Sequence, residues 1–307
     1  MKTVLVTGAT GRLGPHIVGA LLAKDVRVRA LTRDPGRAAV VLPGQADVVA
    51  GDLADPQALR AALTGISDLV LLTPHGPDMY DVQARLIDLA AAVDVRVVKV
   101  SGTSSGIRPD GPDACRQHWL AEEYLRASGL PFAIVRPNAF MQTLLAGVAA
   151  SVRQRGVVVN PLGSAGISIV DCADVGAATA EVICDRRHDG STAVLTGPAA
   201  PTYREIAVEV EMVTGRAVSV VDVTPQQAGE GARANGMSDW EAGHLAEMLA
   251  MFSTGASEYV TTDVQALTGR TPASARDWIR RHADLFTKPA PALAATGATS
   301  ATSEEGS

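Results

Sequence analysis

Two groups of residues in this sequence have the types and the spacing that chemistry requires. Gly8, Gly11 and Gly14 are spaced three apart near the start of the chain, and His118 precedes Glu122 by one helical turn. The glycine spacing is typical of a loop whose backbone amides hold a phosphate at the start of a helix. A histidine, with an ordinary pKa of about 6.5, is the side chain best suited to proton transfer near neutral pH. The sequence therefore predicts an anion site and a proton-transfer site.

The elements that must position these residues alternate regularly through the first 137 residues. Short apolar runs rich in Val and Leu, typical of strands covered on both faces, alternate with segments that carry an apolar stripe at helical spacing. This alternation predicts a Rossmann-type α/β fold, a doubly wound parallel sheet with right-handed crossovers. We expect its strands at Thr3–Thr7, Val26–Leu31, Asp47–Ala50, Leu69–Leu72, Val95–Val100 and Phe132–Val135.

After Pro137 the rhythm changes. We interpret residues 1–137 as the dinucleotide-binding domain and residues 138–287 as a smaller mixed α/β substrate lobe, interleaved with the end of the main sheet. Residues 288–307 are rich in Ala, Pro, Ser and Thr without periodicity, which predicts a disordered tail. In the lobe we expect helices at Phe140–Arg153, Asp174–Cys184, Tyr203–Thr214, 238–252, 261–267 and 273–283, and strands within 157–170, 191–198 and 217–223.

The composition argues against several classes of partner. A net charge of -6 and a pI near 5.5 are unfavourable for nucleic acid or an anionic membrane, because both select basic patches. No apolar run approaches the ~20 residues that span a bilayer, and a first strand at Thr3 leaves no room for a cleavable leader. The three cysteines form no C-x-x-C pair, which favours reduced thiols. We therefore expect a cytoplasmic protein, with a homodimer left open.

The glycine triplet lies between the first predicted strand and the first predicted helix, and this context makes dinucleotide binding a specific prediction. Gly8 makes the tight turn, Gly11 lets the backbone approach a pyrophosphate, and Gly14 lets helix and strand pack closely. About twenty residues further on, where NAD-preferring folds place an acid, the chain has Arg33. Because a guanidinium binds a 2'-phosphate through charge-assisted hydrogen bonds, we predict NADP(H) as cofactor. The alternative is a solvated Arg33 paired with Asp34.

Further cofactor contacts are expected at the carboxyl ends of the parallel strands, where open α/β sheets bind ligands. Arg12 would add a second cation to the glycine loop, whereas Asp52 is explained equally well as a turn-forming residue. The predicted cofactor-binding set is Gly8, Thr10, Gly11, Arg12, Leu13, Gly14, Arg33, Asp52, Leu53, Thr73, Pro74, Ser101, Gly102, Asn138 and Phe140.

Four stretches of the sequence are similar to landmarks of a known family. They are TGATGRLG (Thr7–Gly14), Asp52–Leu53 after the third strand, AEEYLRASGLPFAIVRPNAF (121–140) and VDCADVG (Val170–Gly176). Together they resemble the short-chain dehydrogenase superfamily and, within it, the NmrA-like group. The resemblance covers residues 1–285. It implies either an NADPH-dependent quinone or alkene reductase or a redox-sensing regulator.

The helix before the sixth strand departs from the family pattern. Typical members carry Tyr-x-x-x-Lys there, but here the tyrosine position falls on Ala114 and the lysine position on His118. Isoflavone-reductase-like relatives keep a basic residue at that lysine position without the tyrosine, so the resemblance implies that His118 is the catalytic proton handler. Glu122 would orient its ring or raise its pKa. The alternatives are a surface histidine held by Glu122, and His75 as the proton handler.

These observations predict an NADPH-dependent oxidoreductase. Its expected partner is a small, electron-poor, aromatic or cyclic acceptor, such as a quinone or a conjugated enone. Added charge delocalises in such an acceptor, which fits a site without the family tyrosine. Met141, Leu144, Leu145 and residues 248–252 would line the substrate pocket; the alternative, from their helical spacing, is a role in the core. No ligand spacing for a metal is present. The alternatives are an NADP(H)-binding regulator without turnover, and an isomerase or epimerase.

Overall fold

A seven-stranded sheet forms the centre of the protein, and all of its paired strands run parallel. The computed structural model describes residues 2–287. The strand order is β10-β6-β5-β4-β1-β2-β3, so the direction of winding reverses between β1 and β4, as in a doubly wound Rossmann-type sheet. The strands are β1 (Thr3–Val6), β2 (Arg27–Thr32), β3 (Asp47–Ala50), β4 (Asp68–Leu71), β5 (Arg96–Val100), β6 (Phe132–Pro137) and β10 (Thr192–Leu195).

The six strands predicted in the first 137 residues are confirmed, with β3 at its predicted bounds. Every residue of β4 and of β5 is buried, which is why their sequences are continuous rather than alternating apolar runs. The seventh strand, β10, comes from the second half of the chain and pairs with β6. The chain of the second half therefore contributes to the main sheet.

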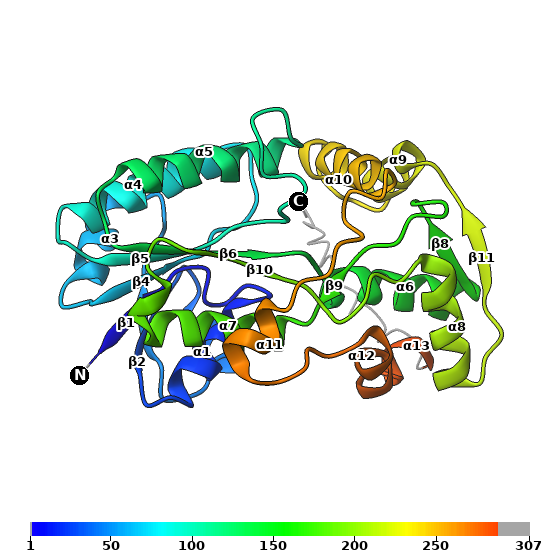
Figure 1. The fold of residues 1–307 in the computed structure, drawn as a ribbon, viewed down its shortest axis with the longest axis horizontal. Coiled ribbons are helices and arrows are strands. Elements are labelled where there is room, and N and C mark those ends of the chain that lie inside the picture. Colours follow the sequence, from blue (N-terminus) through cyan, green and yellow to red (C-terminus); the bar gives the residue numbers. More distant parts are fainter. Residues whose placement is uncertain (1, 288–307) are drawn as a thin grey trace, which may run out of the picture.

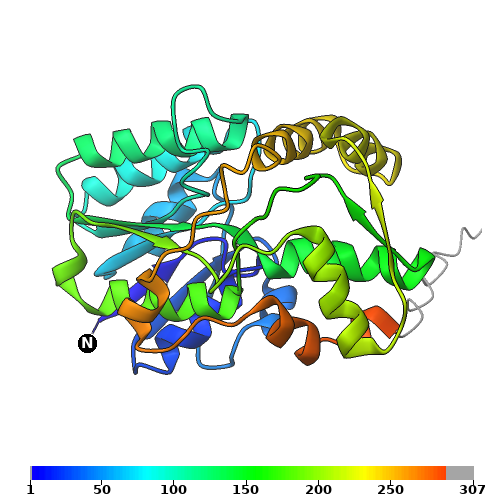
Figure 2. The ribbon, with the colours of Figure 1, turned by 45° about the vertical axis from the view of Figure 1, so that its right-hand side comes forward.

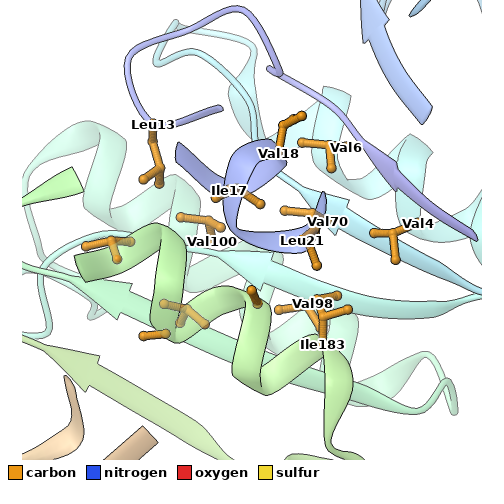
Figure 3. Close-up of a cluster of buried hydrophobic side chains, with 14 of the residues drawn as sticks. Val4, Val6, Leu13, Ile17, Val18, Leu21, Val70, Val98, Val100 and Ile183 are labelled. Atoms are coloured by element: carbon orange, nitrogen blue, oxygen red, sulfur yellow. The ribbon is translucent and has the colours of Figure 1, made fainter. Parts of the chain in front are cut away.

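Two helical layers cover the sheet (Figure 1). One face carries α3 (Pro56–Leu63), α4 (Met79–Ala91) and α5 (Asp113–Ala127); the other carries α1 (Gly14–Leu22), α7 (Cys172–Cys184) and α11 (Asp263–Thr268). The helix α2 (Pro35–Val41) follows β2. Between the second layer and the sheet lies a buried aliphatic core, in which Ile17, Val18 and Leu21 of α1 face Val4 and Val6 (Figure 3).

The second half of the chain has a core of its own. It contains α6 (Met141–Arg155), α8 (Tyr203–Thr214), the parallel pair β8 (Val157–Asn160) and β11 (Ser219–Asp222), and the short pair β7 (Ala139–Phe140) and β9 (Ile169–Val170). Helices α10 (Asp239–Phe252), α12 (Ala275–Arg281) and α13 (Asp284–Thr287) add further apolar residues, including the buried Trp278 and Phe286. The predicted helix α8 has its predicted bounds, and α6, α7, α10, α11 and α12 occur where they were expected.

Besides the four-residue α13, the longer helix α9 (Pro225–Ala234) was not predicted. Its sequence, PQQAGEGARA, contains two glycines and buries only Gly229, so it offers little apolar periodicity. The available signal was its start, where Thr224 and Gln227 form a reciprocal capping box followed by proline at the first turn.

Residues 253–262 connect the two halves across the carboxyl end of the sheet. In both views this segment, drawn in orange, runs from the end of α10 to α11 (Figures 1 and 2). The Ser168 amide donates to the Ser257 carbonyl oxygen at 2.9 Å, and the Thr261 amide donates to Thr196 Oγ1 at 3.0 Å. The segment is therefore hydrogen-bonded on both sides, and it passes directly over the region in which the sequence predicts a ligand.

Two predictions on organisation stay predictions. The division at residue 137 is one, and the disordered tail, residues 288–307, lies outside the described residues. Within the described part of the chain, none of the helices combines the length and the apolar character that a bilayer crossing needs.

Candidate functional site

The glycine loop joins β1 to α1 at the carboxyl end of the sheet. Gly8 has a φ of 61°, and a Cβ atom there would lie 2.7 Å from the Leu72 carbonyl oxygen. A Cβ atom at Gly14 would lie 2.2 Å from the Ala9 carbonyl oxygen. Both approaches exclude a side chain. Gly11 is exposed, which leaves its backbone open to a ligand.

The start of α1 has no side-chain cap. Leu13 is the residue that precedes the helix, and its buried apolar side chain accepts no hydrogen bond from the helix amides. The first amides of a helix lack partners within the helix, so an uncapped start attracts an anion. Thr10 lies beside β2, with its hydroxyl oxygen 3.3 Å from that of Thr32.

Three arginines surround this loop. Arg33 is exposed, and its side chain makes no hydrogen bond or ion pair with residues 2–287. Asp34 does not pair with it; the carboxylate instead accepts the Arg37 amide at 2.9 Å and caps α2. The alternative of an Arg33–Asp34 pair is therefore wrong. Arg37 donates to a carbonyl oxygen of the glycine loop at 3.1 Å, and Arg12 donates to the Thr143 hydroxyl.

The cofactor contacts predicted after β3 and β4 differ in their burial and in the hydrogen bonds that they already make within the protein. Asp52 accepts a backbone amide two residues ahead at 2.8 Å, so it does form the turn after β3. Leu53 is half-buried and Pro74 is exposed. Thr73 is buried, and its hydroxyl accepts a 2.7 Å bond from Gln83 of α4.

His118 is buried in α5, with 4% of its surface exposed. Its Nδ1 atom lies 2.9 Å from Nζ of Lys99, a residue of β5 that is fully buried. Burial lowers the pKa of Lys99 to about 7, against the opposing effect of Glu122. Burial, followed by the charge of Lys99, holds the pKa of His118 well below its usual range. Lys99 was missed in the sequence, although a lysine inside an apolar strand run was a usable signal.

Glu122 does not have the role predicted for it. It is fully buried and accepts hydrogen bonds from Ser101 at 2.6 Å and from Arg136 at 2.5 and 3.0 Å. Arg126 adds a third partner at 2.9 Å. The carboxylate is thus committed to these groups, and neither orients the His118 ring nor raises its pKa. The alternative of a surface histidine held by Glu122 is also wrong, because both side chains are buried.

His118 begins a row of rings that leads outward. The His75 ring lies 5.6 Å from it and the His244 ring of α10 lies 5.7 Å from His75, both edge-on. Trp240 stacks on His244 at 5.3 Å. His75 is exposed, yet the surrounding protein and then the charges of His244 and Lys99 lower its pKa. The α10 residues were missed because they lie more than 120 residues from His118 in sequence.

The loop after β5 carries a hydroxyl network. Thr103 lies 3.1 Å from the Tyr259 phenol oxygen, and Ser105 lies 2.6 Å from the Ser257 hydroxyl. Tyr259 thus brings a phenol to the sheet edge from the connecting segment, which no local pattern predicts. Gly102–Gly106 also matches Gly-x-Ser-x-Gly, but Ser104 lacks a positive φ and α5 begins only at Asp113, so this is no nucleophile elbow.

Several buried polar atoms near the carboxyl ends of the strands have no hydrogen-bond partner among residues 2–287. They are Nε2 of His118, Oδ1 of Asn138, Oε1 of Gln83 and Oγ of Ser104. Asn138 uses its amide nitrogen on Ser168, while its oxygen stays free. An unmade hydrogen bond in a buried site costs free energy, so such a group is a candidate ligand contact. Phe140 is half-buried against the core and precedes α6.

The residues predicted to line the substrate pocket are mostly core. Met141, Leu145, Leu249, Met251 and Phe252 are buried together in the second half of the chain, as their alternative role in the core predicts. Leu144 and Met248 pack against the same core.

Other chemistries find little support in the structure. Burial raises the pKa of the Cys115 thiol to about 12, which removes it as a nucleophile. No group of three or more His, Cys, Asp or Glu that could hold a metal occurs in the described part of the chain.

A surface groove of about 630 Å³ lies elsewhere. It is lined by α8, α12 and residues 198–201, and neither His118 nor the glycine loop contributes to it. Its charged lining residues are satisfied, for example Arg276 by Glu209 at 2.6 Å. We therefore place the candidate site at the sheet edge, where unpartnered polar atoms gather.

Comparison with known proteins adds the family. The NmrA-like family model matches residues 1–263. An NAD(P)H azoreductase of Xenophilus azovorans is 30% identical, over 92% of this chain and 99% of its own. A (4-alkanoyl-5-oxo-2,5-dihydrofuran-3-yl)methyl phosphate reductase of Streptomyces griseus is 34% identical over the same shares. The fold is similar to that of an Escherichia coli NADPH-dependent quinone oxidoreductase complexed with NADPH, with a TM-score of 0.82, 24% identity and coverage of 91% and 99%.

The resemblance inferred from the glycine loop and the strand-end residues is thus confirmed along most of the chain. On this match, the chain belongs to the NmrA-like family.

Proposed function

We propose that this protein is an NADPH-dependent oxidoreductase in which His118 protonates an electron-poor, conjugated acceptor after hydride transfer. The observation that carries the proposal is the buried Nε2 atom of His118, which has no partner among the described residues. It lies beside Gly102, directly after β5, at the edge where doubly wound sheets bind ligands. A buried, unsatisfied nitrogen at such a place is suited to a proton transfer with a bound molecule.

The residues present fit the cofactor. The uncapped start of α1 offers amides to a pyrophosphate, and the side-chain-free approach at Gly8 and Gly14 keeps that surface open. Arg33 has no hydrogen-bond or ion-pair partner within residues 2–287, and it follows the end of β2, where a 2'-phosphate is recognised. The unpartnered oxygen of Asn138 is an acceptor for an amide such as that of nicotinamide. NADP(H) is therefore the cofactor of this proposal.

The relatives support the acceptor class. Their names describe reduction of an azo compound, of an acyl dihydrofuranone and of a quinone. These acceptors share a double bond whose added electron pair spreads onto oxygen or nitrogen. For this chain we propose the same class, a quinone or a conjugated enone with an aromatic or cyclic frame. A planar acceptor also suits the neighbourhood of His75, His244 and Trp240, whose rings lie edge-on or stacked.

The chain's own residues divide the work. The bound cofactor supplies a hydride, and the protein supplies binding, orientation and a proton. His118 holds a proton at the carboxyl end of β5. Glu122, which is held by its arginines, accepts a hydrogen bond from Ser101 and so fixes the start of the loop after β5. The segment 253–262 covers the edge and ties it to the loop through Tyr259.

Turnover assays test the role of His118. The pure protein, mixed with NADPH and a panel of quinones and conjugated enones, should consume reduced cofactor, followed by its absorbance. His118→Ala should lower kcat by about a hundredfold or more, the usual contribution of a general acid, and leave NADPH binding intact. His188→Ala is the matched control, because His188 lies beyond α7, before β10. Equal activity of His118→Ala and wild type would exclude this role.

Cofactor choice is tested at Arg33. Arg33→Asp should weaken NADPH binding by about tenfold or more and leave NADH binding unchanged, because only NADPH carries the 2'-phosphate. Isothermal calorimetry of both cofactors measures this difference. Equal losses for both would remove Arg33 from the site.

A redox-sensing regulator is the rival proposal, favoured by the absence of the family tyrosine at Ala114. It predicts tight NADP(H) binding with no consumption of NADPH on any acceptor. The turnover panel therefore separates the two functions.

A further inference from the structure

Lys99 is a buried cation in the middle of the sheet. It lies in β5, between β4 and β6, with none of its surface exposed. Within residues 2–287 no carboxylate lies within ion-pair distance of its amino group, and its side chain makes one hydrogen bond, to His118 Nδ1. Burying an ammonium group this way is unfavourable for stability, and an apolar residue would fill the space at lower cost. A role in folding therefore does not account for Lys99.

The nearby carboxylate is not its counter-ion. Glu122 is held by Ser101, Arg136 and Arg126. The charge of Glu122 raises the pKa of Lys99, and those of Arg136 and Arg126 lower it. On the outer side, His118 is followed by His75 and His244. These are the titratable and charged groups that face the pair, and burial outweighs all of them.

The chemistry of the bond sets the state of the ring. An ammonium group has donors only, so Nδ1 of His118 must be the acceptor in the 2.9 Å contact. A neutral ring whose Nδ1 accepts carries its proton on Nε2. That nitrogen is buried, has no partner among the described residues, and lies on the ring edge beside Gly102.

We infer that Lys99 is a positioning residue that acts through His118: it holds the ring with its proton on Nε2 and returns a proton to Nδ1 when Nε2 gives its own to the reduced acceptor. The inference rests on the proposed function, in which His118 protonates that acceptor. In this inference the proton is supplied by Lys99 of β5, and not by a residue of α5, the helix that carries His118.

The step is balanced as follows. Hydride addition brings two electrons to the acceptor and leaves it as an anion on oxygen or nitrogen. The Nε2–H bond of His118 breaks as the new bond to that anion forms. An N–H bond of the Lys99 ammonium breaks as Nδ1 gains a proton, so the ring stays neutral and the lysine becomes a neutral amine. After the product leaves, the pair regains one proton from solvent on the side of the exposed His75.

Nitrogen NMR of the NADP⁺-bound protein, with isotope-labelled histidine, tests the positioning directly. At about pH 6, below the pKa of Lys99, the wild-type His118 ring should be protonated on Nε2 and bare on Nδ1. Lys99→Met should lose this preference. Lys99→Arg should keep it, because a guanidinium also only donates. Lys24→Met is the matched control, since Lys24 is a surface lysine paired with Glu181 at 2.8 Å.

Kinetics test the supply of the proton. Wild-type kcat with a quinone should fall as pH rises through about 7, where Lys99 loses its proton. Lys99→Met should lower kcat by about tenfold or more with little change in KM, and its pH profile should be flat over this range. Lys99→Arg should also lack the fall near pH 7, because a guanidinium does not give up its proton there. Thermal unfolding of each variant verifies that it is folded.

The failures of the two proposals are distinguishable. A wild-type protein that consumes no NADPH with any acceptor overturns the proposed function. A His118 ring protonated on Nδ1 in the wild type, or an unchanged ring in Lys99→Met, overturns the inference alone. So does a Lys99→Met variant with wild-type kcat and an unchanged pH profile.

Discussion

The two ends of strand β5 carry buried cations with opposite surroundings. Arg96, at the start of the strand, bonds to Asp189 at 2.6 Å, to Asp68 at 3.3 Å and to two carbonyl oxygens of α7. Lys99, three residues later, has a neutral histidine as its partner. Both side chains are almost fully buried. Arg96 has hydrogen-bond partners for its donors and ties the sheet to α7. Lys99 has no counter-ion among residues 2–287 and lies near the carboxyl end of the strand.

The difference between Arg96 and Lys99 shows how a buried charged side chain with a structural role can be distinguished from one with a functional role. A paired charge with all its donors used gives a defined local geometry, and removing it leaves its partners uncompensated. An unpaired charge contributes nothing favourable to stability, so its presence needs another explanation. At this end of the sheet, the free nitrogen of His118 supplies one.

The largest expected effect is at the satisfied end. Arg96→Met should lower the free energy of unfolding by about 3–5 kcal/mol, because it leaves the fully buried Asp68 with weaker partners. Urea denaturation measures the change, and kcat of the protein that remains folded should be close to wild type. Arg27→Met, on the exposed start of β2, is the control and should change stability by less than about 0.5 kcal/mol. A stable Arg96→Met variant would erase the contrast between the two ends.

Lys99→Met should have the opposite sign. Replacing a buried charge with an apolar side chain is often neutral or stabilising, by up to about 4 kcal/mol. The folded pKa of Lys99, about 7, lies below the value of 10.5 that applies to the unfolded chain. The cost of burying the ammonium is therefore complete below about pH 7 and fades as pH rises toward the unfolded value. Urea denaturation at about pH 6 and about pH 9 should show the larger gain at the lower pH. A gain at the higher pH alone would contradict this assignment.

Glu122→Gln sharpens the comparison, because it removes the nearest negative charge from the Lys99 side. The pKa of Lys99 should fall further, since Glu122 raises it, and the descending limb of the kcat–pH profile should move to lower pH. The variant should also lose about 1–3 kcal/mol of stability, because Arg136 and Arg126 lose their charged acceptor. Glu123→Gln, on the exposed side of the same helix, is the control. An unmoved limb would show that Glu122 does not act on the lysine.

The smallest effect is expected at Tyr259, whose phenol lies at the sheet edge. Tyr259→Phe removes the hydrogen bond to Thr103 and should lower stability by about 0.5–1.5 kcal/mol. Its kcat should stay within about tenfold of wild type, because His118 rather than the phenol is the proposed acid. Steady-state kinetics with the same quinone measure it. A loss as large as that of His118→Ala would transfer the role to Tyr259.

Local patterns predicted much of the frame. Buried strands of Val and Leu are recognisable because both faces of a central strand are covered, and β3 has its predicted bounds. The glycine triplet was readable because its requirements are backbone requirements at fixed spacing. Gly14 packs against the Ala9 carbonyl and Gly176 against α1, so neither tolerates a side chain. Helix α9 was missed because a capping box without an apolar stripe is a weak signal.

The site was predictable only in part. His118 was singled out because a histidine at a family lysine position is visible in sequence, but its partner was assigned to Glu122. The sequence spacing correctly places His118 and Glu122 one helical turn apart. It does not show which other side chains hydrogen-bond to the Glu122 carboxylate. Arg136 comes from β6 and Ser101 from the loop directly after β5, and both donate hydrogen bonds to the carboxylate.

The sequence by itself determined the sheet, the glycine loop, the family and the placement of His118 on the helix before β6, because each depends on local periodicity or fixed spacing. The tertiary structure decided which charges are satisfied. Lys99 meets His118 across 19 positions, Tyr259 meets Thr103 across 156, and His244 reaches His75 from the second half of the chain. Such pairings depend on how the sheet and the connecting segment fold over one another, and burial then sets the charge state of the groups that meet there.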